Sequence, residues 1–237
     1  MRSLSALLLL ATPCTALHAQ WTTNTLVNTS VRSGAGVDAV TPLMSDGPES
    51  STYVSWFDSQ PGGYQLRMQR LDVNGYPLWA AEGLLVSDHP QNSALFRYDL
   101  KTDNEGNAIV AFQDERHENL GIVVYKVSPA GAMLWGADGI ELTDTTSTQG
   151  LSPVIGVLTS NNVVIAWNAS DDTDKWVAMD HVLADGTVPS PAPYRITGPD
   201  KYSRPKVVPM NNNGFFVQYV EEVGNFEYFL PDLYAQC

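Results

Sequence analysis

The stretch YQLRMQRLDVNGYPLWAAEGLLVS, residues 64–87, decides the fold because it returns twice further along the chain. The copies are GIVVYKVSPAGAMLWGADGIELT at 121–143 and, more diverged, VAMDHVLADGTVPSPAPYRIT at 177–197. Each copy contains an apolar strand, a turn that ends in glycine, and a second apolar segment. An internal repeat constrains the fold more strongly than any single motif, so the period of this one is the first quantity to establish.

The turn glycines fix that period. Gly75 and Gly131 lie 56 residues apart, and Gly131 and Gly186 lie 55 residues apart. Glycine at these places is expected to supply the positive φ that a tight hairpin turn requires. Units of about 40–50 residues with four short strands each are typical of propeller blades. We therefore predict an all-β fold, a β-propeller built from four-stranded blades of about 55 residues.

The repeat also divides the chain. Three full units are predicted at about 31–87, 88–143 and 144–197, with a partial fourth at 198–237, inside a propeller region of 20–237. Residues 21–30 resemble the last strand of a unit, which propellers commonly use to close the ring. Residues 233–237 align with 66–70, inside a third strand. Two readings stay open: a fragment of a larger propeller, which we favour, or a four-bladed ring completed by 21–30.

The second strand of each unit carries an apolar, a small and an aromatic residue in succession. The triplets are Val54-Ser55-Trp56, Val110-Ala111-Phe112, Ile165-Ala166-Trp167 and a looser Val217-Gln218-Tyr219. The small residue suits close packing beneath a neighbouring sheet, and the aromatic ring fills the space between sheets. We expect these strands to form the core.

The N-terminus has the layout of a signal peptide at 1–19. A basic start at Arg2 is followed by the apolar run LSALLLLA and by small residues up to Ala16 and Ala19. Cleavage is predicted after Ala19, with Ala16 as the alternative. The run is too short to span a bilayer, so no membrane insertion is expected after cleavage. The protein is predicted to be exported by a bacterium and to be secreted or held at the cell surface.

The net charge limits the kinds of partner that are expected, and the cysteine count limits the disulfides. The formal net charge is −13, which argues against nucleic acid and anionic membranes because both require a basic face. Of the two cysteines, Cys14 lies in the predicted leader, so the mature chain keeps only Cys237 and no internal disulfide is expected.

Several motifs together resemble a known family. A leader that ends in Ala-Gln is followed by Trp21, and the units read aromatic-x-Asp, then Leu-x-x-Gln-Arg-Leu-Asp-x-Asn-Gly, then Leu-Trp-x-x-x-Gly. This combination resembles secreted β-propeller repeat proteins of the Bacteroidetes type over roughly residues 20–237. Such proteins often carry a type IX sorting domain, which this sequence does not show. The resemblance implies a secreted propeller and no single activity.

Two charged positions recur in step with the repeat. Asp58 and Arg70 in the first unit correspond to Asp114 and Lys126 in the second, and both positions change together in the third. We interpret each pair as a cross-strand ion pair within a blade. A residue that recurs in every blade is more often architectural than catalytic.

Polar residues that do not recur are the candidates for chemistry. The weak catalytic candidates are Asp114, Glu115 and His117, with Arg116 as a weak ligand-binding candidate in the same loop. Carboxylates and an imidazole could serve acid–base chemistry on a glycosidic bond. A solvated loop tip is the favoured alternative.

Two further groups are weaker still. The oxygens of Asp171, Asp172 and Asp174 could bind calcium, the one cofactor considered, but the spacing is not that of a defined calcium loop and a solvated turn is favoured. Trp176 is the aromatic candidate for stacking on a sugar ring, beside Tyr98, Tyr194 and Tyr202, with core packing as the favoured alternative.

These residues favour a secreted or cell-surface propeller that acts as a binding or structural scaffold. The alternative is a carbohydrate-active enzyme, a glycosidase or lyase, with catalytic acids partly in other blades. Carbohydrate or a surface protein is the expected partner, and no zinc spacing or nucleotide motif is present in the sequence.

Overall fold

The computed structural model describes residues 30–32, 38–91, 97–117, 119–143, 148–223 and 230–236. The predicted signal peptide at 1–19 lies outside these residues, and so does the predicted closing strand at 21–30 apart from Ser30. The described chain is all-β, with one short 3-10 turn at Pro48–Ser50 (η1).

The strands form four antiparallel sheets in chain order. The first sheet contains β1 (Ala39–Asp46), β2 (Thr52–Gln60), β3 (Gly63–Leu71) and β4 (Leu84–Gln91). The second contains β5 (Asp99–Thr102), β6 (Ala108–Asp114), β7 (Gly121–Val127) and β8 (Ile140–Glu141). The third contains β9 (Gln149–Val157), β10 (Val163–Ser170), β11 (Lys175–Val182) and β12 (Tyr194–Ile196). The fourth contains β13 (Lys201–Pro209), β14 (Phe215–Val223) and β15 (Leu230–Gln236).

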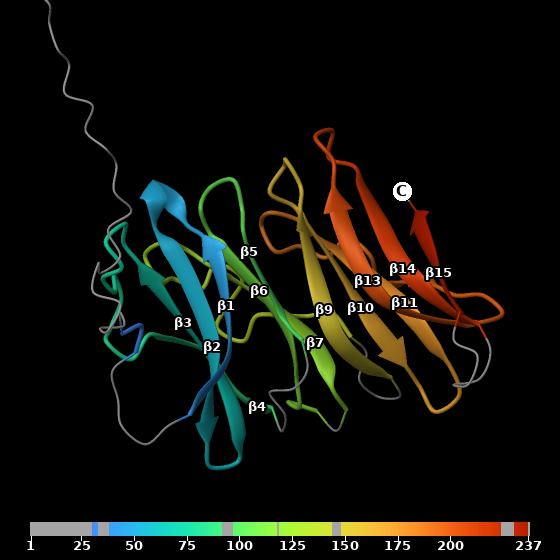
Figure 1. The fold of residues 1–237 in the computed structure, drawn as a ribbon, viewed down its shortest axis with the longest axis horizontal. Coiled ribbons are helices and arrows are strands. Elements are labelled where there is room, and N and C mark those ends of the chain that lie inside the picture. The colour runs from blue at the N-terminus through green and yellow to red at the C-terminus, as the bar shows by residue number, and fades with distance from the viewer. Residues whose placement is uncertain are drawn as a thin grey trace, which may run out of the picture.

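Each sheet is a propeller blade, and we number the blades 1 to 4. The sheets stand face to face in a fan, with neighbours in sequence beside each other (Figure 1). The first strands lie toward a common axis, because β1 contacts β5, β5 contacts β9, and β9 contacts β13. The predicted all-β propeller is confirmed, and β15 pairs with β14 as the third strand of blade 4.

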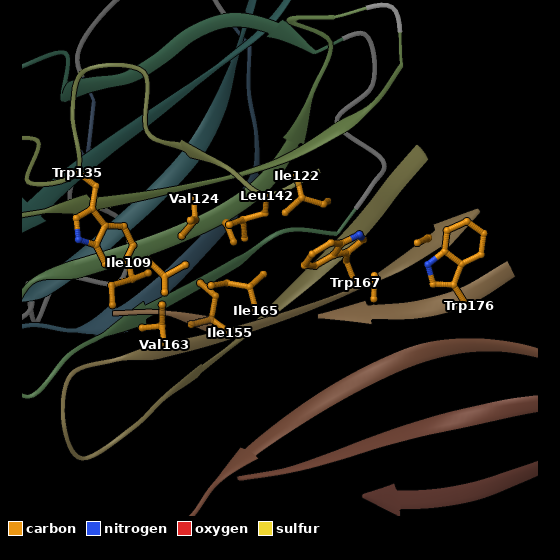
Figure 2. Packing of buried hydrophobic residues seen from close by; sticks show 14 residues of the cluster. Ile109, Ile122, Val124, Trp135, Leu142, Ile155, Val163, Ile165, Trp167 and Trp176 are labelled. Carbon is orange, nitrogen blue, oxygen red and sulfur yellow. The ribbon is translucent and has the colours of Figure 1, made fainter. Parts of the chain in front are cut away.

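The core lies between the blades. Between blades 2 and 3, Ile109 and Ile122 from one sheet meet Ile155 and Ile165 from the next (Figure 2). The predicted triplets are buried in their blades: the small residues Ser55, Ala111 and Ala166 are fully buried, and Trp56, Phe112 and Trp167 are nearly so. The small and the aromatic residue of a triplet point to opposite faces of their sheet, so that Ala111 packs toward blade 3 and Phe112 packs toward blade 1.

The turn between the third and fourth strands has the predicted conformation. Gly75, Gly131 and Gly186 have φ values of 83°, 85° and 91°, in the region that glycine adopts without strain. The fourth strand does not follow at once, since in blade 1 a second turn at Gly83 separates the glycine turn from β4. The hairpin is therefore longer than the sequence pattern indicated.

Candidate functional site

The innermost strands of three blades share a bulge. Thr41, Ser152 and Arg204 each precede a proline, each has a left-handed backbone with φ of 49°, 53° and 55°, and each lies at a shift in strand register. All three stand five residues before the end of their strand, where blade 2 has Arg97. Proline at the next position supplies no N–H to the ladder, which is one reason the pairing shifts here.

Side chains of neighbouring blades hold these bulges in place. The amide oxygen of Asn168 in β10 accepts a hydrogen bond of 2.7 Å from the backbone N–H of Arg204. Gln113, at the equivalent place in β6, accepts one of 3.3 Å from the N–H of Ser152. In the other direction, the hydroxyl of Tyr98 donates to the carbonyl of Thr41 at 2.7 Å. The bulges are thus fixed by contacts from blade to blade.

A cavity of about 780 Å³ opens where the innermost strands of blades 2, 3 and 4 meet. We call it the axial pocket. Its walls are the bulge residues Ser152 and Arg204, Arg97 at the corresponding place in blade 2, neighbouring residues that include Asp99 and Lys206, and Asn168 from β10. This volume lies within the range of small-ligand sites, and concave sites at the ends of blades can be varied without disturbing the core.

The charge of the axial pocket is positive. Arg97, Arg204 and Lys206 are exposed cations in its lining. Asp99 is the one carboxylate among the described lining residues. Its Oδ1 accepts from the Lys101 ammonium at 2.9 Å, and its Oδ2 accepts from the backbone N–H of Ile155 at 2.9 Å. Asp99 therefore links blade 2 to blade 3.

The predicted catalytic loop lies outside this lining. Asp114 ends β6 and is 1% exposed, because the Arg116 guanidinium binds its carboxylate at 2.7 Å. Burial alone would lower the pKa of Arg116, but the hydrogen bonds and charge of Asp114, together with Tyr125, outweigh burial and raise that pKa above its usual value. His117 contacts Glu141 at 3.0 Å, away from Asp114. The structure thus brings Asp114 and Arg116 together, while His117 pairs elsewhere. Glu115 follows Asp114 in the chain and is partly buried.

The predicted calcium loop is a self-contained turn. The carboxylate of Asp171 accepts from the backbone N–H groups of Thr173 and Asp174, both at 2.8 Å. These bonds, that of Thr173 first, lower the pKa of Asp171. Asp172 is exposed beside them. Within the described part of the chain, no group of three or more metal-ligating side chains lies close enough to hold an ion. Calcium remains a prediction.

The aromatic candidates divide into core and surface. Trp176 is 3% exposed and stacks under the Arg195 guanidinium at 4.6 Å. Tyr98 and Tyr202 are also buried, whereas Tyr194 is 54% exposed. Burial raises the pKa of Tyr202 to about 12, with further contributions from Glu221. The favoured alternative of core packing describes three of the four rings.

The interpretation of Asp58 with Arg70 and of Asp114 with Lys126 as ion pairs is wrong. The register pairs Asp58 with Gln65 and Arg70 with Tyr53, so the two charges lie roughly 17 Å apart along the sheet. Asp58 binds Arg67 at 2.9 Å.

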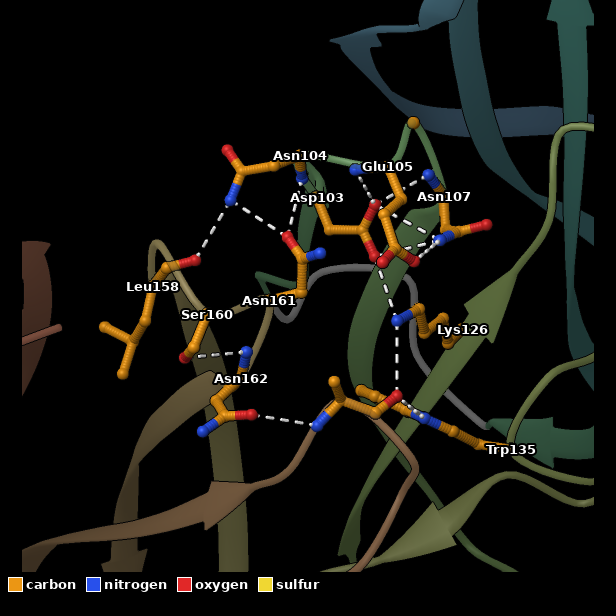
Figure 3. Close-up of polar contacts among 12 residues, drawn as sticks. Asp103, Asn104, Glu105, Asn107, Lys126, Trp135, Leu158, Ser160, Asn161 and Asn162 are labelled. Atoms are coloured by element: carbon orange, nitrogen blue, oxygen red, sulfur yellow. Dashed lines mark hydrogen bonds and ion pairs between the residues drawn. The ribbon is translucent and has the colours of Figure 1, made fainter.

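The repeated cations instead connect blades. Arg70 donates to the carbonyl of Pro129 in blade 2, and Lys126 donates to the carbonyl of Ala184 in blade 3, each at 3.3 Å. Lys126 also binds the buried Asp103 carboxylate at 2.9 Å (Figure 3). The aspartate and the cation stand twelve residues apart in both units because each makes its own recurring contact, and the two do not bind each other.

The axial pocket was missed at the sequence level. Its signal is the X-Pro step that recurs as Thr41-Pro42, Ser152-Pro153 and Arg204-Pro205 while X itself changes. Blade 2 lacks the proline, which hides the period. A fixed frame with a variable residue is the pattern expected of a binding position on a repeated scaffold.

No family model matches the sequence, and no curated protein matches it. Solved structures are similar in fold. The α-L-arabinanase of Penicillium chrysogenum complexed with arabinobiose has a TM-score of 0.55 at 14% identity, over 83% of this chain and 62% of that one. The GH93 α-L-arabinofuranosidase of Fusarium graminearum with arabinobiose has a TM-score of 0.51 at 11% identity, over 82% and 60%. A protein of unknown function from Dyadobacter fermentans has 0.52 at 9% identity, over 80% and 59%.

At these identities the likeness shows the fold alone, and the chain spans between 59% and 62% of the length of these three structures. In the described part of the chain, no helix is long and apolar enough to cross a membrane.

Proposed function

We propose that this chain is the saccharide-binding part of a secreted carbohydrate-active propeller, with the sugar bound in the axial pocket. The observation that carries the proposal is the pocket itself: the frame of bulges repeats, while the residues it presents differ from blade to blade. Residues that recur in every unit of a repeat protein are explained by the packing of the repeats. A ligand-binding site requires residues that differ between units. Export by the predicted signal peptide and the resemblance to Bacteroidetes-type propellers belong to the same proposal.

The fold neighbours support the class of ligand. Two of the three similar structures were solved with arabinobiose, and both are arabinose-releasing or arabinan-cleaving enzymes by name. This support favours a carbohydrate-active protein over the general binding or structural scaffold that the sequence motifs alone indicate. Arabinose-containing oligosaccharides are accordingly one class of ligand to try.

Binding is the step for which the described residues are equipped. Hydrolysis of a glycosidic bond by the usual route requires two carboxyl groups, about 5–5.5 Å apart in retaining enzymes and about 6.5–9.5 Å apart in inverting ones. Among the described lining residues Asp99 is the sole carboxylate, and it is committed to Lys101 and Ile155. A glycosidase or lyase activity would therefore draw its remaining groups from outside this lining.

Calorimetric titration of the mature chain with a panel of neutral and acidic oligosaccharides tests the proposal. The blocking variant is Ser152→Tyr, which places a ring in the axial pocket at a position that is already left-handed with a side chain. The matched control is Thr41→Tyr, which has the same bulge in blade 1 and is not part of the pocket lining.

We expect a saccharide to bind and its affinity to fall at least tenfold in Ser152→Tyr, with no change in Thr41→Tyr. Equal affinity in the two variants would place the sugar elsewhere on the molecule. Absence of binding by every oligosaccharide at millimolar concentration would contradict the proposal. Assay of the same mixtures for new reducing ends or unsaturated products separates binding from turnover.

A further inference from the structure

We infer that the axial pocket selects saccharides that carry a negative charge, a carboxylate or a sulfate group. The inference rests on the proposed function and specifies its ligand. The observation behind it is the convergence of Arg97, Arg204 and Lys206 on one cavity of about 780 Å³.

The concentration of positive charge is unusual for this chain. The sequence has 13 lysine and arginine residues against 26 aspartate and glutamate residues, and three of those cations line this one cavity. The lining carboxylate Asp99 already faces a cation of its own, Lys101, at 2.9 Å. Its negative charge is thus largely balanced without Arg97, Arg204 or Lys206. A concave site lined by one sign of charge concentrates ligands of the opposite sign.

The positions of the cations fit one ligand group rather than a diffuse surface charge. Arg97 and Arg204 occupy equivalent positions in blades 2 and 4, on either side of Ser152 in blade 3, although only Arg204 lies in a bulge. Lys206 follows Arg204 two residues later in β13 and lines the same cavity. Guanidinium groups bind carboxylate and sulfate through paired N–H donors, and an ammonium adds a point charge.

The lining of the axial pocket has fewer groups suited to binding a neutral sugar than to binding an anionic one. Tyr98 is the one aromatic residue among the described lining residues, and its ring is buried against Phe57 with its hydroxyl bound to the carbonyl of Thr41. Trp176 is buried in the core between blades 2 and 3. Stacking on an exposed ring, the usual means of holding an uncharged pyranose, is therefore not provided here, and charge is the stronger source of selectivity.

The test compares oligogalacturonate with the same oligomer after methyl esterification, which removes the charge and keeps the sugar. A sulfated oligosaccharide of similar length forms the second arm. The variants are Arg204→Gln and Lys206→Gln, with Lys201→Gln as the matched control: it lies in the same strand, β13, is exposed, and does not line the pocket. Equal melting temperatures of the three variants would show that the fold is retained.

We expect one or both anionic ligands to bind at least tenfold more tightly than the ester, with an affinity that falls as salt is added. Arg204→Gln is expected to weaken that binding about tenfold, the effect of losing one charged hydrogen-bonding group, and to weaken binding of the ester by a smaller factor. Lys201→Gln is expected to change neither.

Two other outcomes are distinguishable. If ester and acid bind equally, Ser152→Tyr abolishes both, and Arg204→Gln affects neither, the charge selectivity is wrong while saccharide binding in the axial pocket stands. If no saccharide binds, both proposals fail. Whichever ligand binds more tightly, the carboxylated or the sulfated oligosaccharide, identifies the anionic group that the pocket prefers.

Discussion

Lys126 is a buried cation between two blades, and Asp103 neutralises it. Both side chains are almost fully buried and lie 2.9 Å apart. Asp103 also accepts hydrogen bonds from the side chain and backbone of Asn107. Burial alone would raise the pKa of Asp103, but the bonds from Asn107 and Lys126 outweigh it and lower the pKa. The carboxylate therefore stabilises the fold above its unfolded pKa, and this contribution is lost as the pH falls through the lower folded value.

Removing the carboxylate should be costly. Asp103→Ala leaves the Lys126 ammonium buried without its counter-ion, and we expect a loss of about 3–5 kcal/mol in the free energy of unfolding. Lys126→Met should cost less, since Asp103 keeps its bonds from Asn107. Urea denaturation of the two variants measures the difference. Equal losses would show that the charge of Lys126 is solvated by other means.

The pKa of Asp180 is shifted in the opposite direction to that of Asp103. This residue is buried near the blade 3 and blade 4 boundary, and desolvation raises its pKa, against a hydrogen bond from the backbone N–H of His181. A raised folded pKa means that ionised Asp180 weakens the fold above that value, and that the penalty is absent below the unfolded pKa of about 3.9. Asp180→Asn should therefore raise the free energy of unfolding at pH 7 and give no gain near pH 3.

Denaturation at the two pH values checks this, with the exposed Asp172→Asn as a control that should change stability little at pH 7. The same gain at both pH values would mean that the substitution acts through packing instead of charge.

Contacts at this scale were hard to predict from sequence. The third unit has Ala169 and His181 where the first unit has Asp58 and Arg70. This joint change suggested that Asp58 and Arg70 form an ion pair. The antiparallel register separates the two positions, and Arg70 instead bonds the Ser51 hydroxyl, the carbonyl of Pro48 and, in the next blade, the carbonyl of Pro129, with Glu49 at 3.5 Å. A carbonyl leaves no trace in the identity of the residue that carries it, so a contact of this kind cannot be found by comparing residue types.

The turn between third and fourth strands is the element that joins blades along the chain. In blade 1, the indole N–H of Trp79 donates to the carbonyl of Pro129 at 3.1 Å, beside the bond from Arg70. In blade 2, Trp135 and Lys126 donate to the carbonyl of Ala184 in the same way. Each turn thus receives two donors from the blade before it. The glycine is required both for the positive φ and for the closeness of the indole ring.

Substitution of two turn glycines distinguishes the cost of the positive φ from the cost of crowding the indole ring. Gly131→Ala and Gly186→Ala each place a side chain at positive φ, which costs about 1–3 kcal/mol. At Gly131 the new Cβ lies 3.6 Å from Trp79, an ordinary contact, but at Gly186 it lies 2.8 Å from Trp135. We expect Gly186→Ala to cost at least about 1 kcal/mol more, because the ring must shift. Thermal denaturation of the pair measures it, and equal losses would contradict the packing argument.

Most elements were predictable because their signals are local. The turn glycines and the apolar, small and aromatic triplet of the second strand both reflect constraints within a few residues. The gap between the glycine turn and β4 was not predicted, since the second turn at Gly83 depends on the indole of Trp56 and the carbonyl of Met68 packed against it. That is a tertiary constraint.

For the whole molecule, the repeat length was enough to predict the propeller, because a blade buries its faces only against other blades. The site was not predictable in the same way. Attention to charged residues in the loops led to Asp114 and Asp171, both occupied by local contacts. The axial pocket forms only when the innermost strands of three blades converge, so Arg97 and Arg204, 107 positions apart in the chain, come to line one cavity.

A crystal structure of the mature chain soaked with an acidic oligosaccharide would show whether the axial pocket binds an anionic sugar. We expect density for the sugar in the axial pocket, with its anionic group against Arg97, Arg204 or Lys206 and the bulges at Ser152 and Arg204 unchanged. Density on another face, such as the outer turns of blade 1, with an empty axial pocket would contradict it.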